Sequence, residues 1–104
     1  TYLINNNELD SAESILNQAL LMNPIIKELH LNLAYIDILK KKYISAEERL
    51  NYTLLLDPDY LLAYENLLLI ARIQDNSLKS SLYLDKILEI APDHKVKKIL
   101  NKDI

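Results

Sequence analysis

The sequence predicts an all-α fold: a right-handed α–α superhelix, or solenoid, of about three 34-residue helix–turn–helix repeats followed by a C-terminal helix. The first observation behind this prediction is a shortage of helix breakers, since the 104 residues include no Gly and only three Pro. The second is the placement of those prolines, because Pro24, Pro58 and Pro92 are equally spaced along the chain at the length of this repeat. Self-similarity at one fixed period of this length is typical of stacked helical repeats.

An apolar pattern of helical period precedes each proline. Small and large apolar residues follow one another in steps of four, three and one, which places them on one face of a helix. Because proline disfavours helical geometry in the residue before it, each helix is expected to end just ahead of its proline. The matching positions are Ala12, Leu16, Ala19 and Leu20, then Ala46, Leu50, Thr53 and Leu54, then Ser80, Leu84, Ile87 and Leu88.

The first helix of each repeat carries a second pattern, in which a bulky residue is followed three and four places later by Leu and by a small residue. Together with the small residue of the other helix and the closing proline, this pattern resembles the tetratricopeptide repeat family, over residues 1–92. The resemblance implies a helix–turn–helix unit and makes His30 a partly buried packing residue. The positions that carry it are His30, Leu33 and Ala34 in the second repeat, Tyr64, Leu67 and Leu68 in the third, and the matching pair Asn32 and Asn66.

The sequence departs from the family pattern at three kinds of position. Leu68 stands where the family has a small residue, and Asp37 and Ala71 stand where it has an aromatic one. The family's glycine between the two helices is replaced by Asn7, Lys41 and Asp75. Because Asn and Asp tolerate left-handed backbone geometry better than Lys does, we expect the turn at Lys41 to be wound differently.

These patterns divide the chain into elements. We predict a single domain over residues 1–104, made of an incomplete first repeat (1–24), a second repeat (25–58), a third repeat (59–92) and a capping or next-repeat helix (93–104). Residues 1–6 are expected to end an earlier helix, and the later helices are expected at 9–22, 26–40, 43–56, 60–74, 78–90 and 93–102.

Composition excludes most kinds of site chemistry. Without Gly there is no glycine-rich phosphate loop, and without Cys there is no disulfide, thiolate metal site or cysteine nucleophile. The two histidines stand far apart, and no Ser, His and acid arrangement can be argued, so we predict no enzyme, no cofactor and no metal site. A net charge of −3 argues against nucleic-acid binding, and no apolar run is long enough to span a bilayer.

The first helices of stacked repeats are expected to form an inner, concave wall. Its mixture of apolar side chains, amides and one aromatic ring suits an extended or helical peptide, whose backbone the Asn side chains can bind. The face is read as Glu28, Leu31, Asn32, Tyr35 and Leu39, and one repeat later as Leu62, Glu65, Asn66, Leu69 and Ile73. The predicted partner-binding residues are Leu31, Asn32, Tyr35, Leu62, Glu65, Asn66, Leu69 and Arg72.

Some members of the family clamp a C-terminal carboxylate with Lys, Asn, Asn, Lys and Arg on successive first helices. The corresponding places here match only at Asn66, so the cations needed for charge-assisted binding are missing and this mechanism is rejected. The sequence therefore predicts a non-catalytic scaffold that binds a protein or peptide segment through the concave face. Two alternatives stay open: a structural segment of a longer solenoid whose inner face is filled by its own chain, and a regulatory or recruiting module of a multidomain enzyme.

A last prediction concerns the incomplete first repeat. The helix at 9–22 lacks most of its partner helix, so an apolar edge is expected to be exposed there and to be covered by another copy or by further chain. This edge would allow self-association. Its predicted residues are Tyr2, Leu3, Ile4, Leu9 and Leu16.

Overall fold

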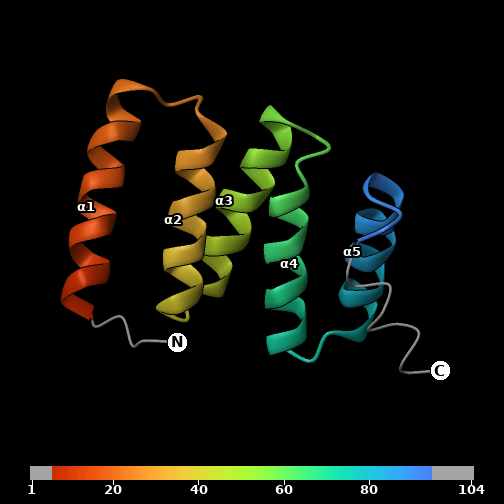
Figure 1. Cartoon of the computed structure of the whole chain (residues 1–104). Helices are drawn as coiled ribbons and strands as arrows, with labels where there is room; N and C mark the ends of the chain where they lie inside the picture. Colours follow the sequence, from red (N-terminus) through yellow and green to blue (C-terminus); the bar gives the residue numbers. More distant parts are fainter. Residues whose placement is uncertain (1–5, 95–104) are drawn as a thin grey trace. The chain divides into compact units, whose positions relative to one another are not determined.

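The computed structural model describes residues 6–94, and every regular element in that range is an α-helix (Figure 1). The predicted all-α class is thereby confirmed for this part of the chain. Residues 1–5 and nearly all of the expected helix at 93–102 lie outside the described residues. The five helices are α1 (Asn6–Met22), α2 (Lys27–Leu39), α3 (Tyr43–Leu56), α4 (Leu61–Ile73) and α5 (Ser77–Ile90).

The chain forms two compact units, Thr1–Pro58 and Asp59–Ile104, and their boundary falls directly after the second of the three prolines. In the first unit, α2 contacts α1 and α3. In the second unit, α4 contacts α5. Each unit therefore contains one helical hairpin, α2–α3 or α4–α5, and the first unit contains the additional helix α1.

The two hairpins repeat one another at the spacing that the prolines predict. Both ends of α4 follow the corresponding ends of α2 by the same interval that separates Pro24 from Pro58, and the same is true of α5 and α3. The expected helices at 26–40, 43–56, 60–74 and 78–90 are confirmed to within one residue at each end.

The turn inside each hairpin is also the same, at the two positions where the family pattern has glycine. Lys41 has φ 63° and Asp75 has φ 54°, so both are in the left-handed region. In the first hairpin the Lys41 and Lys42 amides donate to the Ile38 and Asp37 carbonyls. The Asp75 and Asn76 amides donate to the Arg72 and Ala71 carbonyls in the same way, which is the Schellman pattern of helix termination.

This finding corrects the expectation that Lys41 gives its turn a different winding. A non-glycine residue in the left-handed region costs about 1 kcal/mol, and the two hydrogen bonds that close the turn are sufficient to hold Lys41 there.

The beginning of α1 differs from the predicted arrangement. Asn7 and Glu8 belong to α1, so the turn expected at Asn7 is absent and the helix starts at Asn6. No Gly or Pro interrupts this stretch, and Glu8 in the first turn complements the positive end of the helix dipole. The predicted apolar edge is wrong at Leu9, which is buried, and Leu16 is only half-buried. Tyr2, Leu3 and Ile4 lie outside the described residues.

Each hairpin has its own apolar core. In the first unit the fully buried side chains include Leu33 on α2 and Leu50 on α3. In the second unit Leu68 on α4 packs against Ile87 on α5. His30 is buried, its Nε2 lies 2.8 Å from the Pro24 carbonyl oxygen, and its ring meets that of Tyr52 edge to face with centroids 4.6 Å apart. The predicted packing role of His30 is confirmed.

Candidate partner-binding surface

One face of α2 is open to solvent. Its exposed residues Glu28, Asn32, Tyr35 and Leu39 follow one another in steps of four, three and four, which is the spacing of one helical face. Tyr35 keeps 47% of its surface exposed although it stands between buried residues on either side.

The same face is open on α4, at the positions one repeat later. Leu62, Leu69 and Ile73 are exposed and Asn66 is half-buried. Arg72 is exposed at the margin of this set. We use the name first-helix face for these two sets of positions, which are Glu28, Asn32, Tyr35 and Leu39 on α2 and Leu62, Asn66, Leu69 and Ile73 on α4.

Leu31 does not belong to this surface. Its relative exposure is only 9%, so the prediction that it contacts a partner is not supported. Adjacent residues on a helix diverge by about 100°, so Leu31 points away from Asn32, and α2 has neighbours in both α1 and α3 that can bury it.

Glu65 is the residue that corresponds to Leu31 in the second hairpin, and it already has a partner. Its carboxylate forms an ion pair or hydrogen bond with the Nε2 of His94, which stands just after the turn that follows α5. The His94 side chain is only 9% exposed and that of Glu65 is 29% exposed. Glu65 is thus held within the second unit. Nothing in the sequence links two residues 29 positions apart, so this pair was not predictable from motifs.

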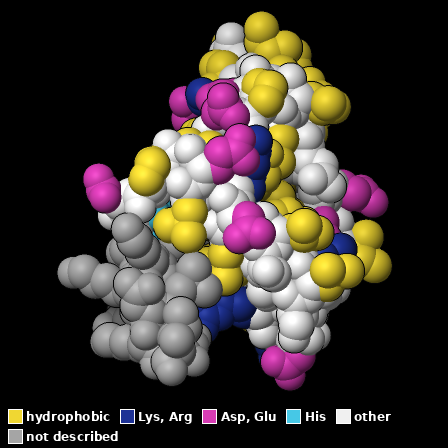
Figure 2. All heavy atoms as spheres, turned by 90° about the vertical axis from the view of Figure 1, so that its right-hand side faces the viewer, with side chains coloured by type: hydrophobic (Ala, Val, Ile, Leu, Met, Phe, Trp, Pro, Cys, Tyr) yellow, Lys and Arg dark blue, Asp and Glu magenta, His cyan; other side chains and the backbone are white. Residues whose placement is uncertain are grey.

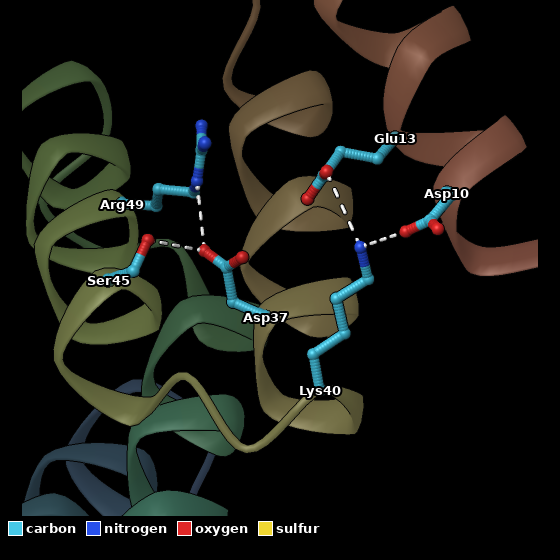
Figure 3. Close-up of polar contacts among 6 residues, drawn as sticks. All are labelled: Asp10, Glu13, Asp37, Lys40, Ser45 and Arg49. Carbon is cyan, nitrogen blue, oxygen red and sulfur yellow. Dashed lines mark hydrogen bonds and ion pairs between the residues drawn. The ribbon is translucent and has the colours of Figure 1, made fainter. Parts of the chain in front are cut away.

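A buried carboxylate, that of Asp37, lies between α2 and α3, and the sequence patterns do not indicate its partners (Figure 3). The Oδ2 atom of Asp37 accepts hydrogen bonds from Ser45 Oγ at 2.7 Å and from Arg49 Nε at 3.0 Å. The Asp37 side chain is 3% exposed and that of Arg49 is 29% exposed. A shallow hollow of about 340 Å³ beside this pair is lined by His30, Ser45, Glu48, Arg49 and Tyr52.

In the second hairpin, all three members of this hydrogen-bonded group are different residues. The positions of Asp37, Ser45 and Arg49 are taken one repeat later by Ala71, Lys79 and Tyr83. The sequence does contain one indication of this pair. Asp37 is a charged residue in the apolar stretch of α2, so its burial requires a cation on the neighbouring helix, and Arg49 is the only Arg on that helix.

Two ion pairs join Lys40, at the end of α2, to α1 (Figure 3). The Lys40 ammonium lies 2.5 Å from Asp10 Oδ1 and 3.4 Å from Glu13 Oε1. The hydrogen bond to Asp10 raises the pKa of Lys40 above its ordinary value of 10.5, against a smaller opposing effect of desolvation.

Apolar exposure is not confined to the first-helix face. Ile44 and Leu78, at equivalent positions near the starts of α3 and α5, are more than 70% exposed. Figure 2 shows hydrophobic side chains at the surface among acidic and basic ones. What distinguishes the first-helix face is that apolar and amide groups recur on it in the same register along two whole helices.

Within residues 6–94, no three side chains of a type that binds metal ions are grouped closely enough to hold one. No helix of that range is both long and apolar enough to cross a membrane. A comparison with models of known protein families gives no match, and a comparison with curated proteins gives none either.

Proposed function

We propose that this chain is a non-catalytic interaction segment of tetratricopeptide-like repeats that binds a peptide or protein segment through the first-helix face. One observation supports this most directly: Asn32, Tyr35 and Leu39 on α2 have the same register as Asn66, Leu69 and Ile73 on α4. A repeated register would present a partner with the same groups twice, one repeat apart, if the two hairpins stack as a solenoid.

The chemistry of the face suits a peptide. Tyr35 offers a large aromatic surface and a hydroxyl at little cost in side-chain entropy, as is common for residues that dominate protein interfaces. The carboxamides of Asn32 and Asn66 each offer donors and an acceptor to a peptide backbone. Leu62, Leu69 and Ile73 supply apolar surface for alternate side chains of the same segment.

The proposal is tested by selecting binding peptides from a random displayed library against the purified chain and measuring their Kd by fluorescence anisotropy. The double variant Tyr35→Ala/Asn66→Ala is expected to weaken binding at least about tenfold, because truncation of a central interface residue typically costs that much or more. The control is Ile44→Ala/Leu78→Ala, which removes more exposed apolar groups from the second helices. Circular dichroism should show unchanged helix content in both variants.

Retention of full affinity by Tyr35→Ala/Asn66→Ala, or an equal loss in the control pair, would remove the first-helix face from the proposal.

A second candidate function is that of a structural segment in a longer solenoid, whose first-helix face is covered by other parts of the same protein. The observation that favours it is the Glu65–His94 pair, in which a residue of this chain already occupies one predicted binding residue. This alternative predicts that library selection yields no peptide whose binding depends on Tyr35 and Asn66.

A further inference from the structure

The shallow hollow beside the Asp37–Arg49 pair contains a cation with unused hydrogen-bond donors. The hollow, of about 340 Å³, is lined by His30 of α2 and by Ser45, Glu48, Arg49 and Tyr52 of α3. All five residues belong to the first unit, and none of them is part of the first-helix face. The hollow is therefore a site distinct from the surface proposed above.

The guanidinium of Arg49 is fixed at one end and open at the other. Its Nε donates a hydrogen bond to Asp37 Oδ2 at 3.0 Å, and Ser45 Oγ holds the same oxygen at 2.7 Å. The two terminal nitrogens point away from Asp37 (Figure 3), and no group within residues 6–94 accepts a hydrogen bond from them. Their N–H groups are thus available, in a preorganised orientation, to a ligand in the hollow that Arg49 lines.

The second hairpin shows that the fold does not require this polar group. Its equivalents of Asp37 and Arg49 are Ala71 and Tyr83, and the ring of Tyr83 lies beside that of Tyr64 with centroids 6.5 Å apart. A buried ion pair is often no more stabilising than apolar residues of similar volume. The presence of the ion pair in the first hairpin alone therefore favours a role beyond stability.

The aromatic side of the hollow suits the methylene stem of a side chain. The ring of Tyr52 is 38% exposed and meets the buried ring of His30 edge to face. Tyr52 and Arg49 are three residues apart on α3, so they are neighbours on the helix surface. A stem that lies against Tyr52 would bring the group at its end to the terminal nitrogens of Arg49.

Charge limits the ligand to a single negative charge. Arg49 is the only basic residue among the described residues that line the hollow, its charge is partly offset by Asp37, and the exposed Glu48 adds a negative charge. A phosphate group carries about −1.5 to −2 and is typically bound by a cluster of Arg. A carboxylate carries one charge, and its two oxygens match the two terminal nitrogens of a guanidinium.

We propose that this hollow binds the carboxylate of an Asp or Glu side chain of a partner protein, whose two oxygens accept hydrogen bonds from the terminal nitrogens of Arg49. Arg49 would then join two carboxylates, that of Asp37 behind it and that of the partner in front. A side chain fits better than a chain terminus, because it reaches Arg49 on a slender stem while its backbone stays outside the hollow.

The test uses the full chain, labelled with nitrogen-15, and the blocked peptide acetyl-Ala-Ala-Glu-Ala-Ala-amide, whose only charge is the side-chain carboxylate. The chain has two arginines, so the Nε–H signal of Arg49 reports on the site and that of Arg72 is an internal control. We expect saturable shifts at Arg49 and at the backbone amide of Tyr52, with a Kd of about 1–10 mM, and none at Arg72. The same peptide with Gln in place of Glu should bind at least about tenfold more weakly, because it cannot form the charge-assisted pair.

Four variants, followed at the Tyr52 amide, separate the roles of the residues. Arg49→Lys keeps the charge but loses the forked geometry, so it should weaken binding about tenfold. Asp37→Ala/Arg49→Met removes the cation without leaving an unpaired buried charge, and it should abolish binding. Glu48→Gln removes a negative charge beside the ligand and should strengthen binding about twofold. The matched control Arg72→Lys should leave binding unchanged.

Equal affinity for the Glu and Gln peptides would overturn the proposal, as would equal shifts at Arg49 and Arg72. Unchanged binding by both Arg49→Lys and Asp37→Ala/Arg49→Met, or weaker binding by Glu48→Gln, would do the same. Two further peptides, acetyl-penta-alanine with a free carboxyl end and the test peptide with phosphoserine in place of Glu, examine the chemistry. Tighter binding of either one would show that the site takes a chain terminus or a phosphate, and the assignment to an acidic side chain would fail. None of these outcomes depends on the first-helix face.

Discussion

Replacing Arg49 with Met is expected to destabilise the α2–α3 hairpin by about 3 kcal/mol, because it leaves the Asp37 carboxylate buried without a counter-charge. Removal of one partner from a buried ion pair typically costs about 3–5 kcal/mol. The lower end applies here for two reasons. Ser45 Oγ continues to donate to Asp37 at 2.7 Å, and the Arg49 side chain is 29% exposed, so solvent already weakens the pair.

Replacing the other partner, Asp37→Ala, should destabilise the hairpin less, by about 1–2 kcal/mol, because it removes the buried charge and allows Arg49 to be hydrated. It also installs the residue that the second hairpin has at the equivalent buried position, Ala71. In the double variant Asp37→Ala/Arg49→Met no buried charge remains unpaired. Its destabilisation should therefore be about 2–3 kcal/mol smaller than the sum of the single changes.

The assay is native-state hydrogen exchange resolved to α2 and α3, with Glu48→Gln at an exposed position of α3 as a control for the loss of a surface charge. Two results would refute the reasoning: a cost below about 1 kcal/mol for Arg49→Met, or single changes whose costs add in the double variant.

Three further predictions concern the turns, the core and the α1–α2 contact. Lys41→Gly should stabilise the first hairpin by about 0.5–1 kcal/mol in urea unfolding, because glycine adopts φ 63° without the steric cost that lysine bears; a destabilising effect would contradict the assigned turn. Leu50→Ala should destabilise by about 3 kcal/mol through a cavity in a fully buried site, whereas Leu55→Ala at an exposed site should change stability little; similar costs for the two would contradict the described core. Because the pKa of Lys40 is raised on folding, its contribution to stability should be complete below pH 10.5 and should be lost as the pH rises through the raised value. The difference in Tm between the wild type and Lys40→Met should accordingly be constant near neutral pH and shrink in alkali, and a difference that grows there would show the opposite linkage.

The helices were predictable from the sequence because the signals that define them are local. The apolar period and the three prolines indicate both hairpins to within one residue, and the exposed register of Tyr35 and Leu69 follows from the same period. The turn at Lys41 could not be predicted from residue preference, since its conformation is fixed by hydrogen bonds to α2 that override the cost for lysine.

Burial and side-chain contacts that depend on which helices pack together could not be predicted from the sequence patterns. The helical register predicts that Leu31 is exposed, but its side chain is buried because α2 has two neighbours, α1 and α3. The partner of Glu65, His94, lies 29 residues away, where no periodic pattern links the two. The predicted turn at Asn7 is wrong because no residue near this position breaks the helix.

The proposed function holds that Asn32 on α2 and Asn66 on α4 bind the same partner segment, and a distance measured between these two positions tests it most directly. The chain contains no Cys, so Asn32→Cys/Asn66→Cys can be spin-labelled at these two sites alone. The axes of packed helices lie about 8–10 Å apart, and the two spin labels add to this distance. If the hairpins stack, we therefore expect one narrow distance distribution below about 25 Å. A broad distribution, or a maximum beyond about 35 Å, would contradict the proposal that one short segment contacts both positions.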